Sequence, residues 1–188
     1  MKGPCKLEQI LPAPMKNKVV AVAAACLLAA GSVFGIGGAK LASYANSTAA
    51  AFSDGMYSIA ADLDARLNSA ANLVTVAEKV SGVSAGSVEA VRSAVDAVNA
   101  AQGPAAKAAA DAALDSAVNA LYDEAVALAD ANQYDLLAGE LAEFNARGNT
   151  IRNNDYNSRA QEFNDTLSGQ PAKLIGALWG IEEAEYYR

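Results

Sequence analysis

Residues 19–39 read VVAVAAACLLAAGSVFGIGGA, an uncharged stretch with Lys18 before it and Lys40 after it. Coiled as an α-helix, this stretch reaches about 30 Å, the thickness of the hydrocarbon core of a bilayer. A helix that is apolar on every side is buried in lipid or among other helices. We therefore predict a transmembrane helix over residues 19–39, with packing in the core of a polymer of many copies as the alternative.

The charges around this segment predict its direction. Residues 1–18 contain four lysines and one glutamate, a net charge of +3, whereas residues 19–188 carry −10 and the whole chain −7. Basic residues that flank a span tend to stay in the cytoplasm. We therefore expect a cytoplasmic basic stub at residues 1–18 and an extracytoplasmic domain at residues 40–188. A cleaved signal peptide and a lipid anchor at Cys26 are the competing interpretations, but the apolar run is longer than that of a usual signal peptide and continues well past Cys26.

Small residues recur every four positions near the end of the segment. Gly31, Gly35 and Ala39 would lie on one side of the helix, where two helices can approach closely. They are a candidate surface for self-association, although this spacing also arises by chance in a run so rich in alanine and glycine. Gly37 and Gly38 predict a bend where the helix leaves the membrane.

The composition excludes several classes of protein. The chain has no histidine and only two cysteines, Cys5 and Cys26. It therefore lacks the imidazole base that many enzymes use and the ligands of a His-rich or Cys-rich metal site. The acidic charge of residues 19–188 argues against nucleic-acid binding, which needs a clustered basic face. We predict a protein without catalytic activity, cofactor or metal.

Beyond the membrane segment, apolar residues recur at the spacing of helices. Stripes at intervals of three and four residues cover 52–77, 88–128 and 134–167, and a short apolar piece covers 174–181. We predict an all-α fold, in which the N-terminal transmembrane helix is followed by an antiparallel bundle of about three long helices and one short C-terminal helix. The first long helix could continue directly from the membrane helix, and Gly103-Pro104 kinks or splits the second.

The C-terminal part of the chain carries a distinctive pattern. Tyr156-Asn157 and Phe163-Asn164 lie seven apart on one predicted helix, and Pro171 and the segment LIGALWGI at 174–181 follow. This order resembles the C-terminal signature of the LemA family, and DARLNSAANLVTVA at 64–77 is similar to a second pattern of that family. The resemblance spans residues 18–187. It implies a membrane-anchored, extracytoplasmic helical bundle with no established enzymatic activity.

The sequence departs from the family pattern at several positions. Ala71 stands where the family usually has proline, Gln170 where phenylalanine is usual, and residues 153–155 replace residues that are often basic. The missing proline predicts a straighter first helix. The lost basic residues put in doubt any role that needs positive charge beside Tyr156.

The most specific candidate positions are Tyr156, Asn157, Phe163 and Asn164. A spacing of seven places the two aromatic residues on one side of the helix and does the same for the two asparagines. We expect the aromatics to pack in the bundle, while the asparagines bond neighbouring backbone or side chains and fix the helix register. A partner-binding groove is the alternative. We expect Asn72 to join the same polar layer.

Two other groups of residues receive structural interpretations. We expect Trp179 to dock against the bundle rather than touch the membrane surface, because most charges near it are acidic. Asp62, Asp64 and the glutamates within residues 182–185 offer oxygen ligands, but they lack the spacing of a calcium-binding loop. We therefore interpret them as parts of solvated helical faces.

These observations predict a non-enzymatic scaffold or adaptor of the cell envelope. Its partners would be the lipid bilayer, through residues 19–39, and copies of itself or other envelope proteins. The alternative is a structural protein that self-assembles into a filament or tube, with the apolar N-terminal helix in the polymer core. The two hypotheses differ in what surrounds residues 19–39.

Overall fold

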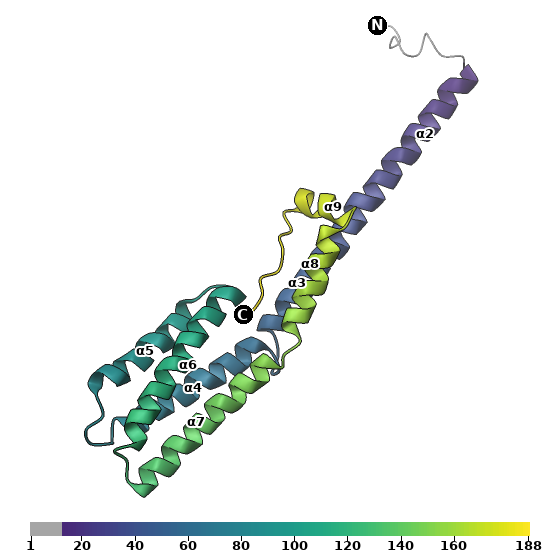
Figure 1. The fold of residues 1–188 in the computed structure, drawn as a ribbon. Helices are drawn as coiled ribbons and strands as arrows, with labels where there is room; N and C mark the ends of the chain where they lie inside the picture. Colours follow the sequence, from purple (N-terminus) through teal and green to yellow (C-terminus); the bar gives the residue numbers. More distant parts are fainter. Residues whose placement is uncertain (1–12) are drawn as a thin grey trace. The chain divides into compact units, whose positions relative to one another are not determined.

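The computed structural model describes residues 13–188, and every regular element within them is helical (Figure 1). The all-α class is therefore confirmed for this part of the chain. Most of the predicted basic stub, including Cys5, lies outside the described residues. The helices are α2 (Ala13–Gly31), the π-helical turn η1 (Ser32–Ile36), α3 (Gly37–Ser53), α4 (Ile59–Ala77), α5 (Ala85–Ala100), α6 (Pro104–Val126), α7 (Ala131–Arg152), α8 (Tyr156–Ser168) and α9 (Ala172–Trp179).

Internal contacts divide the chain into two compact units. The first comprises residues 1–44 and 166–182, and so contains α2, η1, the start of α3, the end of α8 and α9. The second comprises residues 45–165 and 183–188, and so contains α4 to α7 and the remainders of α3 and α8. The last six residues therefore belong to the second unit, although the residues just before them belong to the first.

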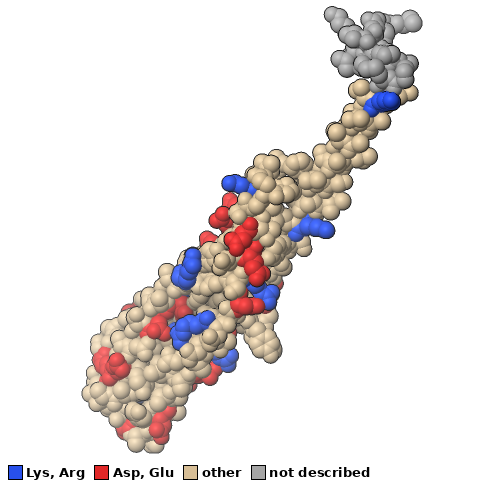
Figure 2. Space-filling view, turned by 45° about the vertical axis from the view of Figure 1, so that its right-hand side comes forward, with Lys and Arg blue, Asp and Glu red and all other residues tan. Residues whose placement is uncertain are grey.

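The first unit is built on a long apolar helix. Residues Asn17–Ser53 form the one described helix that is long and apolar enough to cross a membrane. Its most apolar stretch has no buried residue, and Val20, Leu27 and Leu28 are 68%, 74% and 73% exposed. Figure 2 shows an almost uncharged surface along the helix that adjoins the grey residues. A continuous apolar surface of this kind needs an apolar surrounding, because its exposure to water is costly.

Within the first unit, α9 lies against this helix. The indole Nε1 of Trp179 donates a hydrogen bond of 3.0 Å to the carbonyl of Phe34. The ring of Trp179 fills the space that a side chain at Gly38 would need, and Cδ1 of Ile175 would lie 3.1 Å from a Cβ atom at Gly37. The chain stays helical through both glycines, with the π-helical turn η1 directly before them. The two glycines allow a close approach of α9.

The apolar helix does not continue into α4, the first long helix predicted after the membrane. Residues 54–58 separate α3 from α4. Gly55 has φ +91°, which favours glycine, and Ser58 caps α4 by accepting a hydrogen bond of 3.2 Å from the backbone N–H of Ala61. Met56, which the predicted stripe would bury, is 75% exposed. Local turn chemistry thus overrides the apolar spacing here.

The second unit packs α4 against α7 and α5 against α6, with further contacts of α4 and α7 to α6 (Figure 1). The apolar stripes predicted from the sequence face inward in these four helices. The largest fully buried side chains are all apolar and come from α4 to α8: Ile59, Leu73, Val91, Val98, Leu114, Val118, Leu121, Leu137, Phe144 and Phe163.

The second predicted helix is split rather than kinked. Gly103 has φ +79° and Pro104 opens α6, where a missing backbone N–H costs nothing. The halves on either side, α5 and α6, pack against each other.

The third predicted helix is also divided, contrary to the prediction of one helix over 134–167. It ends at Arg152, and Asn154 begins a new turn by accepting a hydrogen bond of 2.9 Å from the backbone N–H of Tyr156. The Asn154 amide also donates to the carbonyl of Tyr57 at 3.0 Å. An asparagine that bonds nearby backbone offers the chain an alternative to the helix. The predicted stop at residues 169–171 is confirmed, and α4 runs through Ala71 without interruption.

Candidate functional site

Two asparagines of α8 hold the C-terminal residues of the chain. We call residues 183–188 the tail, and Tyr156, Asn157 and Asn164 the tail clasp. The side-chain oxygen of Asn164 accepts from the backbone N–H of Ala184 at 2.8 Å, and its amide donates to the Ala184 carbonyl at 2.9 Å. Asn157 makes the same two bonds to Tyr187, at 2.8 and 2.9 Å. Each asparagine thus pairs with both the backbone N–H and the backbone carbonyl of one tail residue.

The spacing of the clasp matches the spacing of an extended chain. Seven residues of helix advance by about 10.5 Å. Three residues of an extended chain, from Ala184 to Tyr187, advance by about 10 Å. The spacing of seven between Asn157 and Asn164 therefore aligns the two side-chain amides with Tyr187 and Ala184, which are three residues apart in the tail. Of the two interpretations drawn from the sequence, the structure favours backbone bonding by the asparagines.

The aromatic residues of the motif complete this arrangement. The hydroxyl of Tyr156 donates to the carbonyl of Glu185 at 2.7 Å. Burial raises the pKa of Tyr156, and the Glu185 carboxylate adds to the rise, so this hydroxyl stays protonated as a donor. The Tyr156 ring packs on Phe52 with 5.3 Å between centroids, and Phe163 is buried on the same helix. The aromatics therefore pack in the interior as predicted.

Two of the predicted positions lie elsewhere. Asn72 does not join the clasp, because its amide donates to the carboxylate of Glu140 at 3.3 Å in an exposed bond on α4 and α7. Trp179 is held by Phe34 and Gly38 of the apolar helix, a different partner from the one predicted. Gly31 and Gly35 have no described atom near the position that a side chain would occupy, so this face of the helix is open.

The tail ends on a partly buried ion cluster that was not among the predicted sites. The hydroxyl of Tyr187 donates to Asp111 at 2.9 Å. Arg66, whose side chain is 3% exposed, lies 3.2 Å from Asp111 and 2.8 Å from Asp115. Its guanidinium also stacks on the ring of Phe144 at 3.9 Å. We call Arg66, Asp111 and Asp115 the ion cluster.

Burial has the largest effect on the carboxyl of Asp111. It raises the pKa of Asp111, and the nearby Arg66 opposes that rise. Burial and the Asp111 carboxylate also raise the pKa of Tyr187 far above its ordinary value. Tyr187 is therefore a neutral hydrogen-bond donor at every physiological pH. Gly148 leaves room for the Arg66 guanidinium, which would collide with any side chain at that position.

The interpretation of Asp62 as part of a solvated face is wrong. Its side chain is 4% exposed and lies 3.4 Å from Arg147. A sequence signal for both this residue and Arg66 existed, because each falls on the apolar face of α4 beside Leu63. A charged residue on a buried stripe needs a partner of opposite charge.

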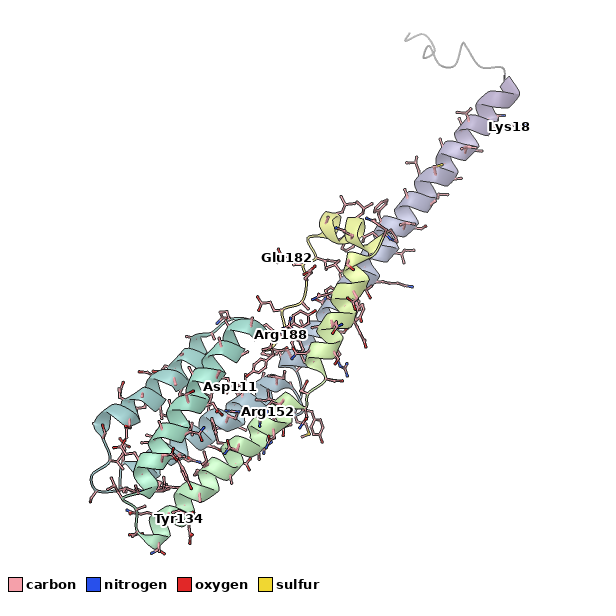
Figure 3. The ribbon with its side chains drawn as sticks, in the orientation of Figure 1. Lys18, Asp111, Tyr134, Arg152, Glu182 and Arg188 are labelled. Atoms are coloured by element: carbon pink, nitrogen blue, oxygen red, sulfur yellow. The ribbon has the colours of Figure 1, made fainter. Side chains whose placement is uncertain are left out.

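A cavity of about 480 Å³ opens beside the ion cluster. Its wall includes the ion cluster, Arg152 of α7, Asn157 of α8, and Tyr187 and Arg188 of the tail. Figure 3 shows Asp111, Arg152 and Arg188 near one another, although they come from α6, α7 and the tail. The tail therefore does two things in this region: it fills the clasp and it forms part of a cavity wall.

The clasp, the ion cluster and the cavity all lie in the part of the chain that comparison with known families recognises. The sequence profile of the LemA family matches residues 55–188. The chain belongs to the LemA family. The match begins after the apolar helix and includes the Tyr-Asn and Phe-Asn pairs that form the clasp. No curated protein and no solved structure matches this LemA-family chain, so its function has to be argued from its own residues.

Proposed function

We propose that this LemA-family protein is a membrane-anchored, extracytoplasmic scaffold or adaptor of the cell envelope that works by protein contact. The observation that carries the proposal is the bare apolar helix, whose most apolar stretch has no buried residue. Lipid around residues 19–39 would cover this surface and place Lys18 and Lys40 near the two headgroup regions. The basic residues before the helix favour a cytoplasmic N-terminus.

The second unit supports a role in contact rather than in catalysis. The side-chain amides of Asn157 and Asn164 both form hydrogen bonds to the tail. The hydroxyls of Tyr156 and Tyr187 also donate hydrogen bonds within the protein. The chain contains no histidine. We propose that α4 to α7 act as an antiparallel bundle that presents its acidic outer surface to copies of the protein or to other envelope proteins. No cofactor, metal or nucleic acid takes part in this proposal.

Cysteine labelling tests the topology. The first variant replaces Cys26 with serine, so that Cys5 is the only thiol. The second variant replaces both native cysteines with serine and introduces a cysteine at the exposed position Ser116. A maleimide that cannot cross membranes should label Ser116→Cys in cells with a permeabilised outer layer, and should label Cys5 only after the inner membrane is broken. Labelling of Cys5 first, or of both sites together, contradicts the proposed orientation.

The same exposed apolar helix could instead form the core of a self-assembling filament or tube, in which the helices of neighbouring copies pack against one another. The open face at Gly31 and Gly35 is the observation that favours this second candidate. Electron microscopy of the purified full-length protein separates the two. Small particles in detergent support the scaffold, whereas uniform filaments with the helix protected from lipid support the polymer.

A further inference from the structure

Two arginines that line the cavity beside the ion cluster, Arg152 and Arg188, are not held in direct ion pairs by the described residues. Arg152 bonds the side chain of Asn149, and Arg188 lies over the ring of Tyr186 at 4.2 Å. Neither forms an ion pair with any carboxylate among residues 18–188, whereas Arg66 is shared between two aspartates. Arg152 acts electrostatically on Asp111, where it opposes the rise of the carboxyl pKa, but no direct ion pair with a described residue holds either guanidinium at the cavity.

The cavity wall also contains buried atoms with unmet hydrogen bonds. Arg66 Nε and Asp111 Oδ1 are buried, and neither has a hydrogen-bond partner. The two atoms are 3.2 Å apart, so their contact is electrostatic without a directed bond. Arg66 is almost completely buried, and an unmet bond on such a group is costly. Arg66 is therefore committed to the ion cluster, and the exposed Arg152 and Arg188 are the cations of the wall that a ligand can reach.

Tyr187 and Arg188 of the tail supply one part of this wall, and that part exists only while the tail is docked. Tyr187 and Arg188 reach the cavity because Asn157 and Asn164 hold the backbone of the tail. Asn164 does not line the cavity itself. Its effect on any ligand would therefore pass through the position of the tail.

We propose that this cavity binds a small organic anion, with its carboxylate or phosphate group between Arg152 and Arg188 and its hydrocarbon part against Ala108, Ala112 and Ile151. Guanidinium groups match the planar geometry of carboxylate and phosphate oxygens. A volume of about 480 Å³ suits a small molecule and not a folded partner. The site is independent of the scaffold role proposed above.

Calorimetry on the full-length protein in neutral detergent tests the site. The probes are glutarate, citrate, phenylphosphate and inorganic phosphate at fixed ionic strength, with glutaramide as the uncharged counterpart of glutarate. We expect at least one of the anions to bind saturably and glutaramide not to bind. Comparison of glutarate with the phosphates identifies which anionic group the site prefers. Absence of saturable binding by all four anions overturns the proposal.

Substitutions locate the binding. Arg152→Gln should weaken the affinity at least tenfold, whereas Arg159→Gln, which removes an exposed arginine paired with Asp155 outside the cavity, should leave it unchanged. Thermal unfolding of each variant serves to check that it is folded. Equal affinity in wild type and Arg152→Gln overturns the site.

A third variant tests the part played by the tail. Asn164→Ala removes both bonds to Ala184 and should weaken anion binding, because Arg188 loses its position. Hydrogen exchange of the tail amides shows whether the tail has detached. A detached tail with unchanged anion affinity overturns the assignment of Arg188 to the site.

Discussion

The two units of this protein place apolar and charged residues in opposite ways. The apolar helix of the first unit exposes Val20, Leu27 and Leu28 over most of their surface. The second unit buries its apolar side chains and also buries Arg66 and Asp111. In water, burying a charge is energetically costly unless the charge is paired. Exposing an apolar helix of this length to water is costly as well. The difference is the one that the proposed membrane anchor predicts, with lipid around the first unit and water around the second.

The largest expected effect comes from removing the cation of the ion cluster. Arg66→Met leaves Asp111 buried without a counter-charge, and we expect a loss of about 3–5 kcal/mol in the free energy of unfolding. Chemical denaturation followed by circular dichroism measures it. The double variant Arg66→Met/Asp111→Asn should recover part of the loss, and Arg92→Met, in an exposed pair with Glu78, should cost less than about 1 kcal/mol. A small effect of Arg66→Met would show that the cluster is solvated.

A charge in the apolar helix should have the next largest effect. Arginine near the centre of a span costs about 2.5–3.5 kcal/mol for insertion. We therefore expect Leu28→Arg to shift a measurable part of the protein out of the membrane fraction. Ser116→Arg, on the exposed face of α6, is the matched control and should leave fractionation unchanged. If equal amounts of the two variants were found in the membrane fraction, the proposal that lipid surrounds this helix would be contradicted.

Loosening the tail clasp should cost less. Asn164→Leu removes two hydrogen bonds to the backbone of Ala184 and a longer one of 3.4 Å to the Tyr186 hydroxyl, each worth at most about 0.5–1.5 kcal/mol net. We expect faster hydrogen exchange at Ala184 and at neighbouring tail amides, with the helices of the second unit unaffected. Asn72→Leu, which removes one exposed bond to Glu140, should leave tail exchange unchanged. Protection of the tail in Asn164→Leu would mean that packing, and not the clasp, holds it.

The smallest effect is a pH dependence at Tyr187. Because burial raises its pKa, the folded protein keeps the phenol proton at a pH where the unfolded chain releases it. The stability from this group is fully present below pH 10 and falls as the pH rises above the ordinary tyrosine pKa of 10.0. Tyr187→Phe should cost about 1 kcal/mol at neutral pH. The difference in the free energy of unfolding between wild type and Tyr187→Phe should then decrease above pH 10. A difference that stays constant would show that Tyr187 is already solvated.

Periodicity predicted which residues are helical better than it predicted where helices end. The stripes at 59–77 and 114–125 lie on α4 and α6 and face the core, because apolar spacing decides burial in a packed unit. The breaks at Gly55 and Asn154 were missed, since each depends on a single residue that bonds or turns the backbone locally. Gly103-Pro104 was recognised because two strong signals coincide there.

The candidate site was predicted only in part, for a related reason. The heptad of Asn157 and Asn164 indicated that both amides bond neighbouring groups, but their partner is a tail with no periodicity of its own. Contacts between residues far apart in the sequence follow from the fold and not from local spacing. The ion cluster had a local signal in Arg66 on an apolar stripe, and its partner Asp111 lies on the stripe of another helix.

Accessibility of a spin label on Cys26 tests most directly whether the two units occupy different solvents. With Cys5 replaced by serine and the protein in liposomes, a label on the exposed Cys26 should collide with oxygen and not with a water-soluble nickel chelate. A label at Ser116→Cys, in a variant without the native cysteines, should show the reverse. Nickel accessibility at Cys26, or protection from both reagents as in a packed polymer core, would contradict a lipid-facing helix.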